Sequence, residues 1–155
     1  MEILLLLLMG GLGIFLILIG IVFYILKSIG LATLAANKGI DSPWLAWIPV
    51  ADLYIAGAIL EEMNLFGIRF TNLALWIPLI ICGGAFLQVI PIIGWLVAVC
   101  VFIFGIGFTY NLFSMYTENA AIFTILSVFL GLWAVFIFVI RNNKPGKMKW
   151  ISEYN

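Results

Sequence analysis

The sequence predicts an all-α integral membrane protein, a bundle of about five transmembrane helices, and three observations support this prediction. Hydrophobic residues make up 66% of the 155 residues, charged residues make up only 9%, and the mean hydropathy is +1.28. Soluble domains contain roughly 45–50% apolar and about 25% charged residues, and a soluble chain of this size cannot bury so much apolar surface. The charges also fall between long uncharged segments. A disordered chain is excluded, because such chains are polar and highly charged.

The first predicted span covers residues 3–26, which carry no charge. With about 1.5 Å of rise per residue, this segment is about 36 Å long as a helix, which is enough for a tilted crossing of a bilayer. We expect it to be retained as a span, because a signal peptide has a basic start and a small-residue cleavage site. The mixed segment from Lys27 to Pro43 predicts a short interfacial helix that ends before Gly39.

Segment 44–60 is open to two interpretations, because it has only 17 residues and contains Pro49 and Asp52. It either crosses the bilayer as a short or broken helix, or dips into the bilayer and returns. Cytoplasmic loops are enriched in Lys and Arg, so the basic residues help to decide. If the segment crosses, six of the seven basic residues are cytoplasmic and Arg69 alone is outside, whereas a returning segment gives four against three. The count favours five crossings, with the N-terminus outside and the C-terminus cytoplasmic.

The rest of the chain predicts three further spans, at residues 73–90, 92–116 and 120–140. The polar connector 61–72 precedes them. Pro91 closes the first of these apolar runs, because proline lacks a backbone N–H and breaks or kinks a helix. Thr117, Glu118 and Asn119 form a polar turn before the last span. The final residues, 141–155, form a basic tail that is predicted to be cytoplasmic.

Asp52 is the one formal charge that falls within a predicted span. A carboxylate at membrane depth costs about 2.5–3.5 kcal/mol and is by default a candidate functional site. One interpretation is a proton- or cation-linked site facing the bundle interior. The polar residues predicted to share that site are Tyr54, Asn111 and Tyr110. The alternatives are a hydrogen-bonded Asp52 that compensates for the backbone break at Pro49, and an interfacial Asp52 that faces water.

The residues around Asp52 carry a resemblance. From Ser42 to Tyr54 the sequence reads Ser-Pro-Trp-Leu-Ala-Trp-Ile-Pro-Val-Ala-Asp-Leu-Tyr. It resembles the Pro-Trp-x-Ala-x-x-Pro-x-x-Asn-Leu-Tyr pattern of uncharacterised small polytopic membrane proteins of Gram-positive bacteria. Asp52 stands where that pattern more often has Asn, which favours a hydrogen-bonding role at this position. The resemblance implies a bacterial cytoplasmic membrane and brings no established activity.

Composition narrows the function classes. Histidine is absent, which removes the commonest general base and metal ligand, so we expect no cofactor and no metal site. The seven basic residues are balanced by seven acidic ones. The chain has no net positive charge that would attract a nucleic acid, so we expect no nucleic-acid partner. The sequence contains no recognisable nucleophile–base pair, and an intramembrane enzyme is therefore not expected.

Two hypotheses for the function remain. The first is a non-enzymatic accessory protein or subunit of a membrane complex that acts through helix packing. The second is a small, oligomeric ion or solute transporter or channel that uses Asp52. The expected partners are the lipid bilayer, another membrane protein or further copies of the same chain. Asp52→Asn separates the two hypotheses, because it abolishes transport but leaves a packing protein assembled.

Overall fold

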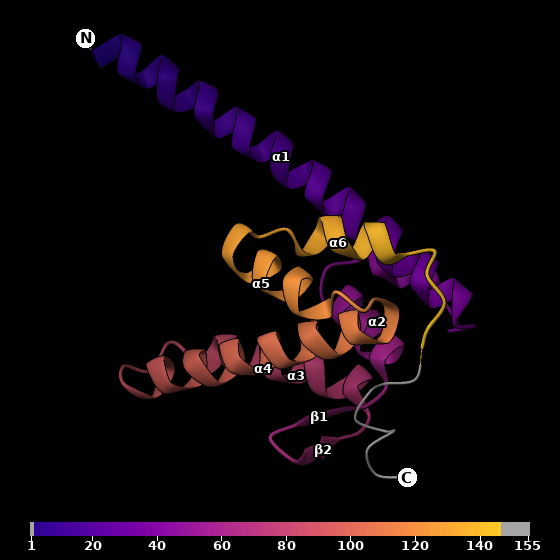
Figure 1. Cartoon of the computed structure of the whole chain (residues 1–155). Helices are drawn as coiled ribbons and strands as arrows, with labels where there is room; N and C mark the ends of the chain where they lie inside the picture. The colour runs from indigo at the N-terminus through magenta and orange to yellow at the C-terminus, as the bar shows by residue number, and fades with distance from the viewer. Residues whose placement is uncertain (1, 147–155) are drawn as a thin grey trace.

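The computed structural model describes residues 2–146, with side chains from residue 10 onward. Apart from one short β-hairpin, the regular structure of this part of the chain is helical, as the sequence predicts (Figure 1). In chain order the elements are α1 (Glu2–Asn37), the 3-10 helix η1 (Pro43–Trp47), α2 (Ala51–Leu60), β1 (Met63–Leu65), β2 (Ile68–Phe70), α3 (Leu73–Leu87), α4 (Ile93–Tyr116), α5 (Ala120–Leu130) and α6 (Trp133–Ile140). Two helical stretches, Gly10–Asn37 and Ile93–Tyr116, are long and apolar enough to cross a membrane.

Helix α1 is one continuous helix of 36 residues, about 54 Å long at 1.5 Å per residue. Its N-terminal part projects away from the other elements (Figure 1). Its C-terminal part is packed, and Ser28, Leu31 and Leu34 are buried there. The first predicted span and the predicted interfacial helix are therefore one helix. It ends at Asn37, before Gly39, whose φ of 73° ends the helical conformation.

Segment 44–60 is broken, which is one of the forms predicted for it. Its first residues belong to η1, and its last ten form α2, with Pro49 in the turn between the two helices. Proline cannot donate a backbone hydrogen bond, so a break at this point follows from the sequence. Ile55 and Ile59 of α2 have no exposed surface, which places α2 in the centre of the core.

The polar connector 61–72 contains a β-hairpin that the sequence does not predict. Strands β1 and β2 are antiparallel, and Asn64 is paired with Arg69. The two-residue loop between them, Phe66 and Gly67, has φ angles of 53° and 82°. Two consecutive positive φ angles match the twist of a tight hairpin, but Asn or Asp is the usual first residue of such a turn. Phe66 gives no such signal.

Helices α3 and α4 form a helical hairpin. α3 ends at Leu87, short of the predicted limit at residue 90, and α4 begins at Ile93, one residue after the predicted start. Pro91 lies in the connection between the two helices, where the sequence places a helix break. The second half of α4 contributes to the core, with Phe108, Leu112 and Phe113 buried.

The predicted span 120–140 is not a single helix. It consists of α5 and α6, which are separated at Gly131 with a φ of 67°. Glycine adopts this left-handed conformation without the steric cost of a Cβ atom, so the chain can turn there. With two candidate spans among the described helices, the predicted bundle of about five transmembrane helices is not confirmed.

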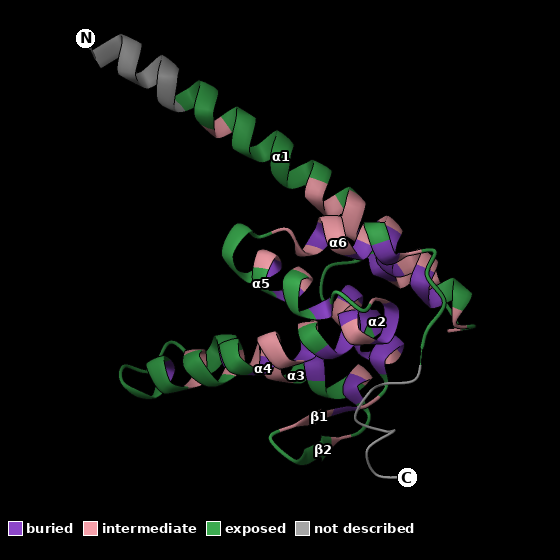
Figure 2. Ribbon diagram, viewed as in Figure 1, coloured by how far each residue is buried: buried purple, intermediate pink, exposed green. Residues whose placement is uncertain are grey.

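The core lies between the C-terminal part of α1, α2, the start of α3, the second half of α4, and α6 (Figure 2). Phe113 of α4, Phe123 of α5 and Phe136 of α6 form an aromatic cluster on one side of this core. Phe123 and Phe136 are stacked with ring centroids 4.3 Å apart, and Phe113 meets both edge-on. These geometries are the favoured ones for aromatic pairs and hold α4, α5 and α6 together.

Candidate functional site

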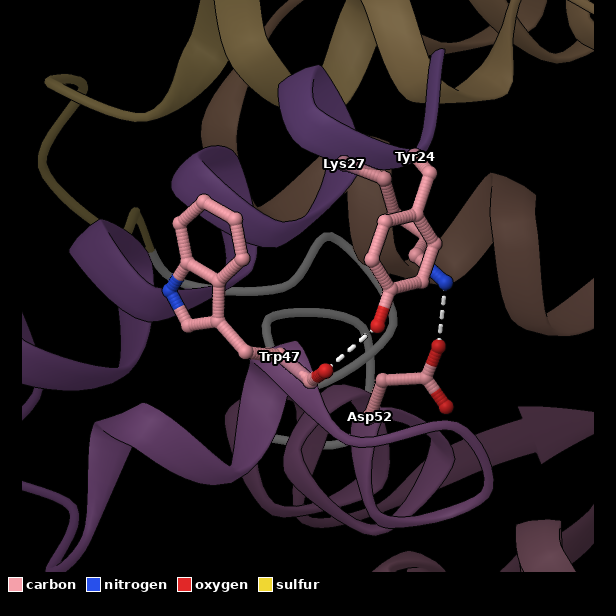
Figure 3. Close-up of polar contacts among 4 residues, drawn as sticks. All are labelled: Tyr24, Lys27, Trp47 and Asp52. Carbon is pink, nitrogen blue, oxygen red and sulfur yellow. Dashed lines mark hydrogen bonds and ion pairs between the residues drawn. The ribbon is translucent and has the colours of Figure 1, made fainter. Parts of the chain in front are cut away.

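The candidate site joins three elements: Tyr24 and Lys27 from α1, Trp47 from η1, and Asp52 from α2 (Figure 3). Tyr24 and Lys27 are three residues apart on a helix and therefore share a face. The Lys27 Nζ atom donates a hydrogen bond to Asp52 Oδ2 and forms an ion pair with it. The Tyr24 hydroxyl donates to the backbone carbonyl of Trp47. We call these four residues the α1–α2 clasp.

The charges of the clasp are largely shielded from solvent. The side chain of Asp52 is 9% exposed and that of Lys27 is 20% exposed. The Lys27 Nζ atom also lies 4.7 Å from the centre of the Tyr24 ring, a distance at which the ring face attracts a cation. Asp52 occupies the first turn of α2, where the helix dipole favours a negative charge. The carboxylate of Asp52 is thus compensated by both a cation and a helix terminus.

The hydrogen bond from Tyr24 compensates for the break in segment 44–60. η1 ends at Trp47, and the next N–H group, that of Ile48, already donates to the carbonyl of Leu45 at 3.0 Å. In a continuous α-helix the Trp47 carbonyl would accept from the N–H of Ala51, a bond that the break at residues 48–50 removes. The Trp47 carbonyl instead accepts a hydrogen bond from Tyr24. Tyr24 thus satisfies the carbonyl at the break, and Asp52 itself pairs with Lys27.

The other predicted site residues lie apart from the clasp. Tyr54 and Tyr110 are 39% and 44% exposed, whereas Asn111 is buried. The Asn111 side-chain amide donates to the carbonyl of Gly107 at 2.8 Å, within its own helix. Within residues 10–146, no hydrogen bond or ion pair joins any of these three residues to Asp52. The structure therefore does not assemble the four predicted polar residues into one site.

A cavity of about 320 Å³ lies between α2, α3, α4, α5 and α6. Its lining is mainly apolar, and Thr109 and Ser127 supply the hydroxyl groups. The lining residues are Leu53, Ala56, Ile77, Ile81, Phe102, Gly105, Ile106, Phe108, Thr109, Ser127, Val128 and Trp133. Asp52 is not part of this lining. The site that the transporter hypothesis places at Asp52 is therefore separate from this cavity.

Sequence reasoning identified Asp52 but missed its partners. From the sequence alone, Lys27 marks the end of the first predicted span and Tyr24 is part of that span. The available signal was the i, i+3 spacing of Tyr24 and Lys27, which puts an aromatic ring and a cation on one helical face. Trp47 takes part through its backbone carbonyl. Every residue has such a carbonyl, so the residue type at position 47 gives no sign of this contact.

No second candidate site stands beside the clasp in the described part of the chain. Among the described side chains, no group of three or more Cys, Asp and Glu residues is arranged to hold a metal ion. Comparison with protein families, with curated proteins and with solved structures finds no match to this chain. The resemblance of residues 42–54 to small polytopic membrane proteins therefore stays a prediction.

Proposed function

We propose that this chain is a non-enzymatic integral membrane protein, an accessory protein or subunit of a membrane complex. In this proposal α1 crosses the bilayer and contacts a helix of a partner membrane protein. The observation that carries the proposal is the exposed apolar surface of the projecting part of α1 (Figure 2). Ile14, Phe15 and Ile17 are 63%, 59% and 64% exposed. Contiguous apolar surface of this kind is costly in water, so lipid or another helix covers it.

One face of the projecting part of α1 suits a partner helix. Gly10, Gly13 and Gly20 are separated by three and seven residues, which places them on the same side of a helix. A Cβ atom added at any of these glycines would have no neighbour within 4 Å. Small residues on one face allow two helices in a bilayer to approach closely. We therefore place the partner helix on this face, which we call the glycine face.

The α1–α2 clasp favours a packing protein over a transporter. A transport site needs a carboxylate that exchanges its partner with a substrate or proton. Asp52 instead binds Lys27 of the same chain, and the pair is largely shielded from solvent. The ion pair attaches α2 to the helix that we propose crosses the bilayer. Its role in this proposal is to hold the rest of the chain on α1.

The proposed location is a bacterial cytoplasmic membrane. The resemblance of residues 42–54 to membrane proteins of Gram-positive bacteria supports this location, as does the high mean hydropathy of +1.28. The two helical stretches that are long and apolar enough to cross a membrane, Gly10–Asn37 and Ile93–Tyr116, also support it.

The test is purification of the tagged chain in a mild detergent, with the glycine face altered. We expect a stoichiometric partner membrane protein that is lost from the variant Gly13→Ile/Gly20→Ile. The matched control is Leu12→Phe/Ile19→Phe, which adds bulk on the opposite side of α1 and is expected to retain the partner. A partner that is insensitive to the glycine-face variant contradicts the proposed contact. Purification as a homo-oligomer that conducts ions, with conductance lost in Asp52→Asn, replaces the proposal with the transporter hypothesis.

A further inference from the structure

The chain before segment 44–60 meets the chain after it. Lys38 directly follows α1, five residues before η1, and Glu61 directly follows α2. The Lys38 Nζ atom is 2.8 Å from Glu61 Oε1 and donates a hydrogen bond to the carbonyl of Ile59 at 2.5 Å. The hydrocarbon core of a bilayer is about 30 Å thick, so a segment that crosses it has ends at least that far apart. The chain between Lys38 and Glu61 therefore does not cross the bilayer: it begins and ends at the same depth.

The two ends of segment 120–140 also meet. The side-chain amide of Asn143, after α6, donates to the carbonyl of Tyr116, before α5, at 2.9 Å. The backbone N–H of Gly146 donates to the carbonyl of Met115 at 2.7 Å. The two helices between these points have 11 and 8 residues. Their lengths of about 16 and 12 Å correspond to roughly half of the hydrocarbon core.

Both pairs of ends lie on the same side of the packed core. The side chain of Asn37, at the end of α1, donates to the carbonyl of Arg141 at 3.0 Å. The N–H of Leu73, at the start of α3, donates to the carbonyl of Glu61 at 3.2 Å. These contacts bring the ends of α1, α2 and α6 together with the start of α3 (Figure 1). We call this region the charged end; its charged residues are Lys38, Asp41, Glu61, Glu62, Arg69, Glu118, Arg141 and Lys144.

The turns at the opposite limit of each segment are apolar and exposed. Phe129 and Leu130, at the turn between α5 and α6, are 81% and 63% exposed. Ile48 and Val50, on either side of Pro49, are 42% and 54% exposed. The Trp47 carbonyl in this turn is satisfied by Tyr24, which meets the requirement that irregular backbone at membrane depth has hydrogen-bond partners. The exposed side chains of these turns are apolar and fit acyl chains, and Asp52, next to the turn at Pro49, is shielded by its ion pair with Lys27.

We infer that residues 43–60 and 120–140 are re-entrant segments, which enter one leaflet from the charged end and return to it. This inference rests on the proposed membrane location. The α3–α4 hairpin also returns to the charged end, so α1 alone places the two chain ends in different compartments. Residues Asp41, Thr71, Glu118 and Asn142 then all face the compartment of the charged end. The five-crossing topology instead places Thr71 and Glu118 opposite the other two.

The distribution of basic residues agrees with this topology. All seven Lys and Arg residues follow residue 26, the last residue of the uncharged stretch in α1. With both segments re-entrant, the six Lys and Arg residues outside the clasp all lie on one side, whereas five crossings place Arg69 opposite the other five. The earlier count of four against three assumed that segment 44–60 returns while 120–140 crosses. Lys147 and Lys149 lie outside the described residues and enter this count by sequence alone.

The test measures the sidedness of single cysteines. The native Cys82 and Cys100 are replaced by Ala, and a cysteine is then introduced at Asp41, Thr71, Glu118 or Asn142, all exposed or partly exposed positions between helices. A membrane-impermeant maleimide is applied to membrane vesicles of known orientation. We expect all four cysteines to react from the same side, and an N-terminal epitope tag to be detected from the other side. Any division of the four positions between the two sides overturns the inference for the segment that separates them.

Carbonate extraction of the same vesicles separates the two proposals. If the chain is released by carbonate, the proposed integral membrane location fails. If the chain stays in the membrane and the labels alternate between the two sides, the location holds and the re-entrant topology fails. Retention in the membrane together with one-sided labelling supports both.

Discussion

Helix α1 and segment 120–140 share a composition but differ in fold. Residues 3–26 and residues 120–140 are both free of charge and rich in Leu, Ile, Val and Phe. α1 nevertheless continues as one helix through Gly10, Gly11, Gly13 and Gly20, whereas segment 120–140 turns back at Gly131. Hydropathy and glycine content therefore do not decide between a continuous and a returning segment in this chain.

The contacts around each segment explain the difference. A Cβ atom at Gly13 or Gly20 would have no neighbour within 4 Å, so no contact with another element bends α1 at these glycines. Beyond Gly131, the chain is held by two other elements. A Cβ atom at Gly30 of α1 would be 2.7 Å from Ile137 Cγ2 of α6, and Asn143 binds the carbonyl of Tyr116. Tertiary contacts at both limits of segment 120–140 thus favour a return.

The largest expected effect comes from separating α1 from segment 44–60. Asp52→Leu removes the partner of Lys27 and leaves a largely buried cation uncompensated, so we expect a loss of about 3–5 kcal/mol in the free energy of unfolding. The double variant Lys27→Met/Asp52→Leu replaces the ion pair by apolar side chains and is expected to return to within about 1 kcal/mol of the wild type. The measurement is SDS titration in mixed micelles, followed by tryptophan fluorescence.

Two results would contradict this role for the clasp. One is a single variant Asp52→Leu as stable as the wild type, because the ion pair would then contribute nothing to the packing of α2 on α1. The other is a double variant no more stable than the single one, because the loss would then come from the shape of the Asp52 position. A transport function would give a different pattern, because the double variant would then fold like the wild type but lose its transport activity.

The sequence was sufficient for features that depend on composition and local breakers. The helical class, the limits of α4 within one residue, and the positions of Pro49 and Pro91 between helices all agree with it. Asp52 was identified because a lone carboxylate in an apolar segment is conspicuous. These features follow from residues near one another in the chain, for which hydropathy and backbone chemistry are adequate guides.

The sequence was insufficient for features that depend on distant contacts. Lys27 is 25 residues from Asp52, and nothing in the spacing shows that the two side chains meet. The turn at Gly131 depends on contacts with α1 and with the carbonyl of Tyr116. The count of basic residues favours five crossings only while 120–140 is taken to cross; the re-entrant topology that we propose adds a return of that segment as well.

A smaller effect is expected from separating α1 and α6. Gly30→Leu places a side chain where the first added atom would be 2.7 Å from Ile137 Cγ2 and 2.9 Å from its backbone carbon. Overpacking of this kind costs about 1–3 kcal/mol, which the same SDS titration measures.

The matched control is Gly20→Leu in the same helix, where the added atom has no neighbour within 4 Å. We expect the control to be unchanged or up to about 1 kcal/mol more stable, because leucine favours helix over glycine. Equal losses in both variants would show that α1 does not depend on its contact with α6.

The smallest expected effect is at the turn that distinguishes segment 120–140 from α1. Gly131→Ala puts a Cβ atom on a residue with a φ of 67°, which costs about 1–2 kcal/mol even though no neighbour lies within 4 Å. Gly83→Ala in α3 adds the same atom to a helical glycine with equally open surroundings, and we expect a gain of about 0.5–1 kcal/mol. The opposite signs isolate backbone conformation from packing, because neither substitution touches another residue. If Gly131→Ala were as stabilising as Gly83→Ala, residue 131 would be helical, and segment 120–140 would continue as one helix like α1.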